Sequence, residues 1–455
     1  MNNKIFVQIA SYRDPELIPT IKDLIDKSNN PENLVIVVAW QHGADENLTD
    51  FLTANFEYKA SYSHKHLEVD NSFKEFKVFT LEDIDKKAIV KLIDVDYNYA
   101  KGACWARHLI QTFYEEEEYT LQLDSHHRFV EGWDAELITM LNQLKEKGHE
   151  KPLLTSYIPS FDPDNDPDGR VQVPWWMTFD RFIPEGAVFF LPAELPDWRN
   201  RNEPIPARFY SAHFAFTGGE FAKEVMHDPN YYFHGEEISI AVRAFTHGYD
   251  LFHPHKVIAW HEYTRKGRTK HWDDDASWSL LNEECHRRNR ILFGIQESNM
   301  PEIEKETMFG KYGFGKKRSL QDYEKYAGLR FKDQSVQKYT LENNIAPNPI
   351  LSEKDYNESF LRRFKHCIDI HKTVFENINY QFCVVAFHNE NEDTLYRKDL
   401  TKEEIDALLS NSKGSEFINI WSEFYPDEKV SYWVVWPYDI NTGWAERLTG
   451  SLEYR

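Results

Sequence analysis

The sequence predicts an α/β protein with a smaller β-rich domain after it. In the first part of the chain, short apolar segments alternate with segments of helical periodicity, which is typical of a sheet flanked by helices. The run Leu34–Trp40 is continuous and β-branched, as strands in the middle of parallel sheets are. Near the C-terminus, Tyr380–His388 and Val430–Tyr438 are aromatic, β-branched runs that indicate strands of a different domain.

The elements of the main domain can be followed in order. Lys4–Ala10 is an apolar strand, residues 11–16 form a loop, and the next segment to Lys27 has helical periodicity. Ala88–Asp94 is another short strand, and a helix opens at Gly102. Tyr119–Leu123 is an apolar, β-prone run that reads as a buried strand. In a sheet of this kind, ligands collect at the carboxyl ends of the strands.

The later elements complete this domain and lead into the next. Pro152–Tyr157 is strand-like, a helix opens near His234, and a final strand leads to His261. A charged helix is expected near Leu400–Ser410, between the C-terminal strand groups. We therefore predict a main domain of residues 1–342, a linker of residues 343–350 and an accessory domain of residues 351–455. The accessory domain is expected to be a sandwich that binds the acceptor or mediates self-association.

Composition excludes several classes of protein. Lys plus Arg number 53 and Asp plus Glu number 75, so the net charge is −22 and a nucleic acid is not expected as a partner. The four cysteines lie far apart without a CxxC pair, which argues against structural zinc and a disulfide framework. No apolar stretch has the length of a signal peptide or a membrane span, so we expect a cytoplasmic protein.

The strand Tyr119–Leu123 ends in a cluster that could bind a metal. Asp124 and His126 are two residues apart, so in an extended chain both side chains lie on one face. A carboxylate oxygen and an imidazole nitrogen there can bind one divalent cation. The alternative is a helix cap made by Asp124 or Ser125, followed by surface histidines.

Other strand ends carry further polar residues. The Ser11 and Gln41 loops follow the first two strands and are expected at the same edge of the sheet. His261 follows a late strand and could close the metal site. The pair Gly218-Gly219 would let backbone approach a ligand closely, although an ordinary turn is the alternative.

Five short motifs occur in a specific order. These are Ser11-Tyr12-Arg13-Asp14, Asp124-Ser125-His126, Trp133-Asp134, His234-Gly235-Glu236-Glu237 and His261-Glu262-Tyr263. With them, the chain resembles the cytosolic polypeptide and hydroxyproline N-acetylglucosaminyltransferases from about Lys4 to about Phe331. The resemblance implies the GT-A nucleotide-diphospho-sugar transferase fold, a Rossmann-like mixed sheet flanked by helices. It also implies a UDP-GlcNAc donor, a divalent metal and transfer with retention to a protein or glycan acceptor.

The resemblance also assigns roles to residues. Asp124-Ser125-His126 stands where such enzymes carry an Asp-X-Asp motif, so Asp124, His126 and His261 are the expected metal ligands. Imidazole ligands favour Mn²⁺ over Mg²⁺. Glu236 and Glu237 resemble the carboxylates that face the acceptor hydroxyl, although acids in a first helical turn also suit the helix dipole.

The donor is expected to meet residues from several of the motifs. Arg13 and Arg107 are candidates for the uridine or the diphosphate, Arg107 because residues 102–107 resemble the glycine-bearing nucleotide segment of these enzymes. Arginine makes bidentate phosphate contacts, and a salt bridge is the alternative. Trp133 could bind the GlcNAc moiety with Asp134, or the tryptophan could be core and the aspartate a cap. The expected donor-binding residues are Ser11, Tyr12, Arg13, Gln41, Arg107, Ser125, Trp133, Asp134, Gly218 and Gly219.

Two other functions are compatible with the same residues. A metal-dependent hydrolase of a phosphorylated sugar would use Asp124, His126, His127 and His261 to activate water. A non-catalytic carbohydrate-binding protein would use the aromatic residues, which make up 15% of the chain. UDP binding that requires Mn²⁺ would favour the transferase over both.

Overall fold

The chain divides into two compact units in the computed structural model, which describes residues 3–295, 300–376 and 379–452. Unit 1 comprises Met1–Lys332 and Tyr339–Leu351, and unit 2 comprises Asp333–Lys338 and Ser352–Arg455. The predicted linker, residues 343–350, falls within unit 1, and the independence of the two domains stays a prediction. Among the described residues, no helix has the length and apolar character needed to cross a membrane.

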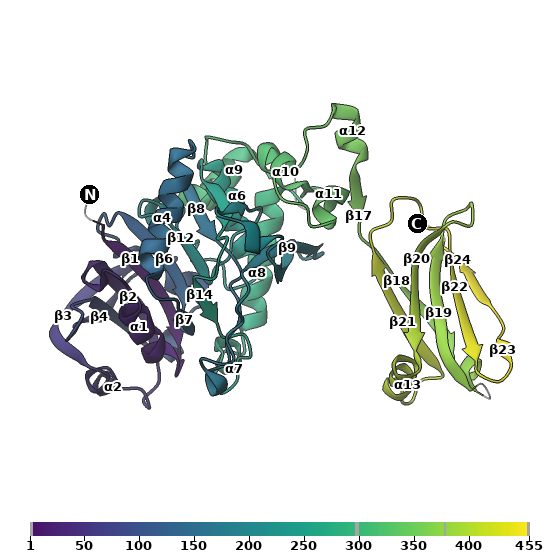
Figure 1. Ribbon diagram of the computed structural model, residues 1–455, viewed down its shortest axis with the longest axis horizontal. Helices are drawn as coiled ribbons and strands as arrows, with labels where there is room; N and C mark the ends of the chain where they lie inside the picture. The colour runs from purple at the N-terminus through teal and green to yellow at the C-terminus, as the bar shows by residue number, and fades with distance from the viewer. Residues whose placement is uncertain (1–2, 296–299, 377–378, 453–455) are drawn as a thin grey trace. The chain divides into compact units, whose positions relative to one another are not determined.

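Unit 1 is built on a mixed sheet of ten strands (Figure 1). The strand order is β11 (Ile205–Pro206), β13 (Asp250–His253), β8 (Pro152–Thr155), β12 (Phe214–Gly218), β6 (Tyr119–Asp124), β1 (Ile5–Tyr12), β2 (Leu34–His42), β5 (Ile89–Asp96), β4 (Phe73–Asp83) and β3 (Phe56–Leu67). The central strands β6, β1, β2 and β5 are parallel, whereas β12 runs antiparallel to β6. The predicted α/β class and mixed sheet are thus confirmed.

Helices cover both faces of the central strands, which explains why these strands are apolar throughout. One core packs Ile5, Val7 and Ile9 of β1 against α1 (Leu17–Asp26) and α4 (Trp133–Glu146). A second core places Phe6 and its neighbours on the other face against α3 (Ala103–Gln111). Because both faces of these strands are buried, their residues are apolar along the strand, and polar side chains are found where the strands end.

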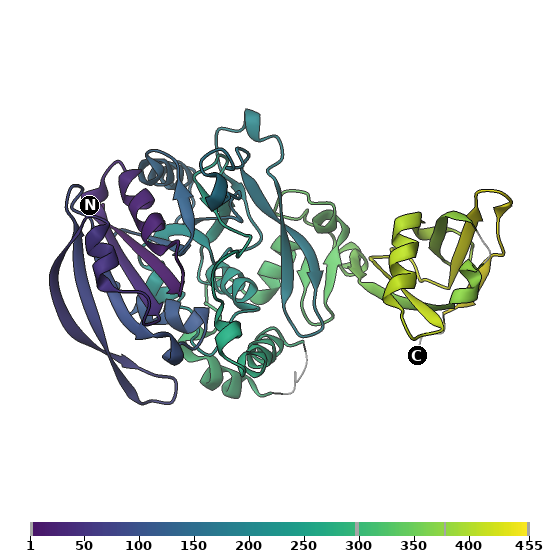
Figure 2. The same cartoon turned by 90° about the horizontal axis from the view of Figure 1, so that it is seen from below.

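Shorter elements surround this sheet. Two small antiparallel pairs form from β7 (His127–Phe129) with β14 (Ala259–His261) and from β9 (Trp175–Phe182) with β10 (Val188–Glu194). Figure 2 shows β3 and β4 as a long hairpin at the sheet edge. The remaining elements of this unit are α2 (Leu48–Thr53), α5 (Phe221–Glu224), α6 (Glu236–Thr246), α7 (His271–Asp274), α8 (Trp278–Phe293), α9 (Glu302–Phe309), α10 (Leu320–Ala327) and β15 (Leu329–Arg330).

Unit 2 is β-rich, as predicted. One sheet pairs β18 (Phe364–His371) with β21 (Phe417–Phe424). The other contains β20 (Thr394–Thr401), β19 (Tyr380–His388), β22 (Tyr432–Asp439), β23 (Gly443–Trp444) and β24 (Leu448–Ser451). The two sheets share one core with Ile405 of α13 (Lys402–Asn411), the helix predicted there. This unit also contains β16 (Ser335–Gln337), β17 (Phe360–Arg362) and α12 (Glu353–Glu358), while α11 (Lys338–Leu341) follows β16.

Candidate active site

A pocket of about 530 Å³ lies at the carboxyl ends of the central strands. Tyr12 at the end of β1, Gln41 near the end of β2 and Asp124 at the end of β6 all line it. Parallel pairing brings these three strand ends together, with Tyr12 opposite Gln41 and Ala10 opposite Asp124. The N-terminus of α6 contributes Glu236 and Glu237 to the same pocket.

Three of the pocket residues form a group that could hold a metal ion. The ligand atoms of Asp124, His126 and His261 all lie within 4.8 Å of one another. His261 reaches the others because β14 pairs with β7, which places it opposite His127. Asp124 Oδ2 is 3.5 Å from His261 Nε2 and 3.9 Å from His126 Nε2.

The chemistry of these ligands fits a divalent cation. Within the described part of the chain, neither ring nitrogen of the buried His261 has a hydrogen-bond partner. Burial lowers the pKa of His261 well below its usual value, although the Asp124 carboxylate, 3.5 Å from His261 Nε2, opposes this. The imidazole is therefore neutral, as a metal ligand must be. Burial opposes ionisation of Asp124, but His261 and Arg107 hold the pKa of that carboxyl well below its usual value.

Asp14 orients one of the metal-site histidines, and it was named in a motif but given no role from the sequence. Its Oδ2 is 2.7 Å from His126 Nδ1 and accepts a 2.5 Å hydrogen bond from Ser125 Oγ. Burial would raise the pKa of Asp14, but His126, Ser125 and Arg268 outweigh it and hold that pKa at about 2. A carboxylate on the outer nitrogen of a metal-binding histidine fixes the ring and leaves the other nitrogen free to ligate.

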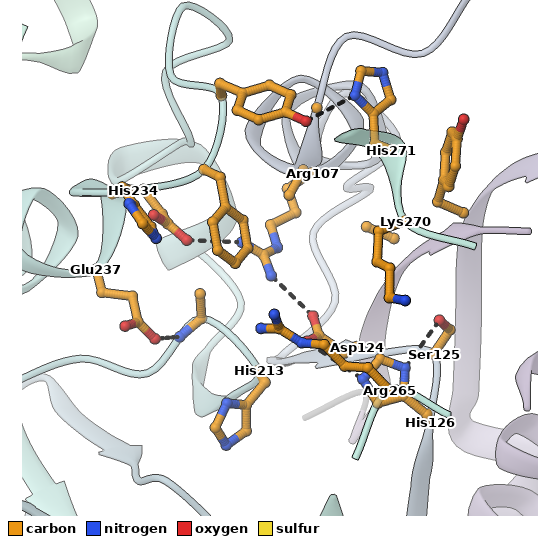
Figure 3. A pocket seen from close by; sticks show the side chains of 18 of the residues that line it. Arg107, Asp124, Ser125, His126, His213, His234, Glu237, Arg265, Lys270 and His271 are labelled. Carbon is orange, nitrogen blue, oxygen red and sulfur yellow. Dashed lines mark hydrogen bonds and ion pairs between the residues drawn. The ribbon is translucent and has the colours of Figure 1, made fainter. Parts of the chain in front are cut away.

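Arg107 connects the metal group to the glutamates. Figure 3 shows its guanidinium directed at Asp124, to which Nη2 donates a 2.9 Å hydrogen bond. Its Nη1 is 3.6 Å from Glu236 Oε1. Burial, together with the charge of Glu237, raises the pKa of Glu236 to about 8, while Arg107 opposes the shift.

Both carboxylate oxygens of Glu237 accept hydrogen bonds. Tyr157 donates a 2.7 Å hydrogen bond to Oε2, and the Ala212 backbone N–H donates one of 2.9 Å to Oε1. Burial raises the pKa of Glu237 in spite of these donors. The ring of Tyr157 stacks on His213, which in turn stacks on His261. Tyr157 and His213 were not predicted, because no spacing in the sequence relates them to the site.

Some of the predicted donor-binding residues line the pocket, and others lie beside it. Tyr12, Gln41, Arg107 and Ser125 line it. Arg13 forms a 3.0 Å ion pair with Asp274, the same carboxylate that accepts a hydrogen bond from Tyr12. Ser11 is fully buried beneath this edge, where its carbonyl accepts a hydrogen bond from Gln41.

Trp133 and Asp134 have the roles that were the alternative to donor binding, a core tryptophan and an aspartate that accepts backbone hydrogen bonds. Trp133 is completely buried in the core and donates a hydrogen bond to the Leu24 carbonyl. Asp134 is also buried and accepts hydrogen bonds from Ser28 Oγ and from the backbone of Asn29 and Asn30. Neither is among the residues that line the pocket, so the predicted donor contact is corrected to a packing role.

Gly218 and Gly219 lie away from the pocket as well. Because β12 runs antiparallel to β6, Gly218 pairs with Tyr119, at the opposite end of β6 from Asp124. A Cβ on Gly219 would lie 1.9 Å from the Glu117 carbonyl oxygen, so backbone and not ligand approaches closely there. The structure therefore supports the interpretation that Gly218 and Gly219 form an ordinary turn.

Unit 1 is thus a mixed α/β sheet whose pocket lies at the carboxyl ends of its parallel strands. The family model described as Glycosyltransferase (GlcNAc) matches residues 4–333, and the chain belongs to this family. No curated protein matches the chain.

Solved glycosyltransferase structures are similar only at a distance. GalNAc-T7 with UDP, GalNAc and Mn²⁺ has 13% identity and a TM-score of 0.42, covering 70% of this chain and 56% of that one. S. aureus TarS 1–349 in complex with UDP-GlcNAc has 12% identity and a TM-score of 0.37, covering 68% and 71%. The Pyrobaculum calidifontis mannosyltransferase PcManGT with GDP-Man and Mn²⁺ has 8% identity and a TM-score of 0.35, covering 68% and 70%. The family assignment therefore rests on the family model.

Proposed function

We propose that this glycosyltransferase moves GlcNAc from UDP-GlcNAc to a hydroxyl of a Ser, Thr or hydroxyproline side chain in a protein, with retention at the anomeric carbon. The observation that carries the proposal is the group Asp124, His126 and His261 in one pocket with Glu236 and Glu237, in a chain of the GlcNAc family. Mn²⁺ is the favoured ion, because two of the three ligands are imidazoles. We also propose that the protein acts in the cytoplasm.

Each group in the pocket has a physical task in this reaction. A dication held by Asp124, His126 and His261 would stabilise the negative charge that develops on the departing diphosphate. Asp14 holds the His126 ring in the orientation that ligation requires. Glu236 or Glu237 orients the acceptor hydroxyl, and whichever of them is ionised can take its proton.

The retaining route proposed here is a front-face transfer without a covalent intermediate. Both glutamates already have fixed partners, Arg107 for Glu236 and Tyr157 with Ala212 for Glu237. These contacts suit residues that position an acceptor. A glycosyl adduct trapped on either glutamate and identified by mass spectrometry would overturn this route.

The test is UDP release from UDP-GlcNAc, UDP-GalNAc and UDP-glucose, with Mn²⁺, with Mg²⁺ and with EDTA. We expect UDP-GlcNAc and Mn²⁺ to give the highest rate. Asp124→Ala and His261→Ala should each reduce it more than about 100-fold, since even an outer partner of a metal ligand is worth roughly 10–100-fold. His255→Ala is the matched control, because His255 is a buried histidine outside the pocket lining and should preserve most of the rate.

The same assay separates the competing functions. Release of phosphate from a sugar phosphate without transfer to any acceptor would establish the hydrolase. Oligosaccharide binding without any nucleotide binding would establish the carbohydrate-binding protein. Transfer of radiolabelled GlcNAc to protein, lost on protease treatment, would establish the protein acceptor.

A further inference from the structure

Arg268 lies within the candidate metal group, although no sequence motif pointed to it. Its Nη1 contacts both ring nitrogens of His126, with Nε2 at 2.7 Å, and is 3.3 Å from Asp14 Oδ2. Its Nη2 is 3.6 Å from Glu262 Oε2. The side chain is only 13% exposed, so the guanidinium is built into the site and is not a surface group that points there by chance.

One lone pair of His126 has two competing partners. A neutral imidazole has one N–H and one acceptor nitrogen. Asp14 takes the N–H at Nδ1, which leaves Nε2 as the acceptor. Nε2 is the nitrogen that faces Asp124 and would ligate a cation, and Arg268 Nη1 lies against it as well as against Nδ1. A metal–nitrogen bond is about 2 Å long, so the guanidinium and a cation exclude one another at this atom.

The segment that carries Arg268 can move without unfolding the site. On its N-terminal side, the Glu262 carboxylate accepts a 2.8 Å hydrogen bond from the Arg265 backbone. On its C-terminal side, Asp274 is held by Tyr12 at 2.8 Å. Between these anchors, Gly267 has a φ of +70° and no heavy atom within 4 Å of its ideal Cβ position. Open space and a glycine backbone allow residues 266–269 to change conformation while both anchors stay in place.

A displaced guanidinium would still face the pocket. Arg265 and Lys270, on either side of Gly267 and Arg268, line it together with Arg268. Three cations on one wall suit an anion with several oxygens, such as a diphosphate. The nucleotide would thus offer Arg268 a new partner when it leaves His126.

We propose that Arg268 competes with the divalent cation for His126 Nε2 and thereby couples cation binding to nucleotide binding, an inference that rests on the proposed function. A cation that binds alone must displace Arg268 from its partners without compensation. A cation that binds with a nucleoside diphosphate releases Arg268 to the phosphate oxygens. Each ligand therefore raises the affinity for the other, by the same factor in both directions.

The experiment measures Mn²⁺ binding to the full-length protein by electron paramagnetic resonance and calorimetry, with and without UDP. The variant is Arg268→Gln, which removes the charge and keeps a polar side chain. Without UDP, we expect it to bind Mn²⁺ about tenfold more tightly than the wild type, within the usual range of coupling between sites. The gain in Mn²⁺ affinity on adding UDP should fall by a similar factor.

Arg265→Gln is the matched control. Arg265 lies on the same wall but stacks over Trp272, 5.4 Å from its ring centre, and no contact joins it to His126 among the residues described. It should leave Mn²⁺ affinity without UDP unchanged. Circular dichroism and thermal melting confirm that each variant is folded, and Arg268→Lys, which restores the charge, should return Mn²⁺ affinity toward the wild-type value.

The outcomes separate this inference from the proposed function. Equal or weaker Mn²⁺ binding by Arg268→Gln without UDP would overturn the competition while leaving the metal site intact. Absence of Mn²⁺ binding in every protein, with and without UDP, would overturn the metal site and the competition together.

Discussion

Arg107 is the residue on which the electrostatics of the pocket depend most. It is 4% exposed, and its guanidinium lies between the carboxylates of Asp124 and Glu236. A buried carboxylate is stable only when it is paired or protonated. Arg107 thus compensates a proposed metal ligand and a proposed acceptor-facing group at once, which the sequence alone did not indicate.

Replacing Arg107 by Met should destabilise the protein strongly. The change would leave the half-buried Asp124 carboxylate and the buried Glu236 without their shared cation, and breaking a buried pair costs about 3–5 kcal/mol. Chemical denaturation followed by tryptophan fluorescence measures the loss. Arg265→Met, which removes an exposed guanidinium from the same pocket, should change the free energy of unfolding by less than about 1 kcal/mol. Equal effects of the two variants would contradict this role.

Tyr157→Phe should impair turnover more than substrate binding. The variant loses the 2.7 Å hydrogen bond to Glu237 Oε2 and keeps the ring that stacks on His213. A buried carboxylate that loses one donor costs about 1–3 kcal/mol, and Glu237 is then free to leave its working position. Steady-state kinetics should show a lower kcat with little change in the KM for UDP-GlcNAc.

Tyr263→Phe is the matched control for that substitution. Tyr263 belongs to the same aromatic group, but its hydroxyl donates to the Ile158 carbonyl at 2.8 Å and not to a glutamate. It should reduce kcat less than Tyr157→Phe does. A larger effect of Tyr263→Phe would show that the hydroxyl on Glu237 is not what matters.

At the scale of elements, the strands that can be recognised from the sequence are those with both faces buried. β1, β2, β5 and β6 are apolar runs, and the structure confirms them. β3 was not predicted, because most of its residues are exposed on both faces and it has no buried stripe. The pairing of β7 with β14 could not be predicted either, since the contact joins residues far apart in the chain. That pairing is what brings His261 to Asp124.

The start of α6 depends on Gly235. Gly235 has a φ of +90°, and a Cβ there would lie 2.1 Å from Asn289 Nδ2. Gly235→Ala should therefore shift the first turn of α6, which carries Glu236 and Glu237, and lower kcat at least about tenfold, because small displacements of catalytic groups have large effects. UDP release and thermal melting measure the two consequences.

Gly248→Ala controls for backbone strain alone. Gly248 has a φ of +97°, yet its nearest neighbour would be Lys317 Cγ at 3.5 Å, an ordinary contact. Both variants should lose about 1–2 kcal/mol of stability from the left-handed backbone. Only Gly235→Ala should lose activity, and a similar loss in Gly248→Ala would remove the link between Gly235 and the glutamates.

At the scale of the whole molecule, basic residues gather at the pocket of an acidic chain, although acidic residues line the pocket as well. The chain has a net charge of −22, and the pocket lining contains Arg107, Arg265, Arg268 and Lys270 together with Asp14, Asp124, Glu236, Glu237 and Glu262. Composition alone disfavours a polyanion as a partner, but it says nothing of a local cluster that suits a small phosphorylated ligand. The metal group could be predicted because Asp124 and His126 are neighbours in sequence, whereas Arg268 reaches it only through the folded loop.

Buried histidines dominate the pH dependence expected for the whole fold. Burial lowers the pKa of His108 to about 3, that of His253 to about 3 and that of His255 to about 4. In the unfolded chain these imidazoles bind protons near pH 6.5, whereas in the native state they stay neutral at that pH. Their contribution to the free energy of unfolding is therefore complete above pH 6.5 and is lost as the pH falls below it. Glu236 acts in the opposite direction, because its raised pKa of about 8 adds stability below about pH 4.5 that is lost as the pH rises through 8.

Denaturation in EDTA at pH 7.5, 6.5 and 5.5 tests this balance. Each histidine whose native pKa is that low should cost about 1.4 kcal/mol between pH 7.5 and 5.5, so these three should cost on the order of 4 kcal/mol together. His255→Gln should make the dependence shallower by one such step, because it removes one titrating group. A free energy of unfolding that stays constant or rises toward pH 5.5 would mean that carboxyl groups like Glu236, and not the histidines, control acid stability.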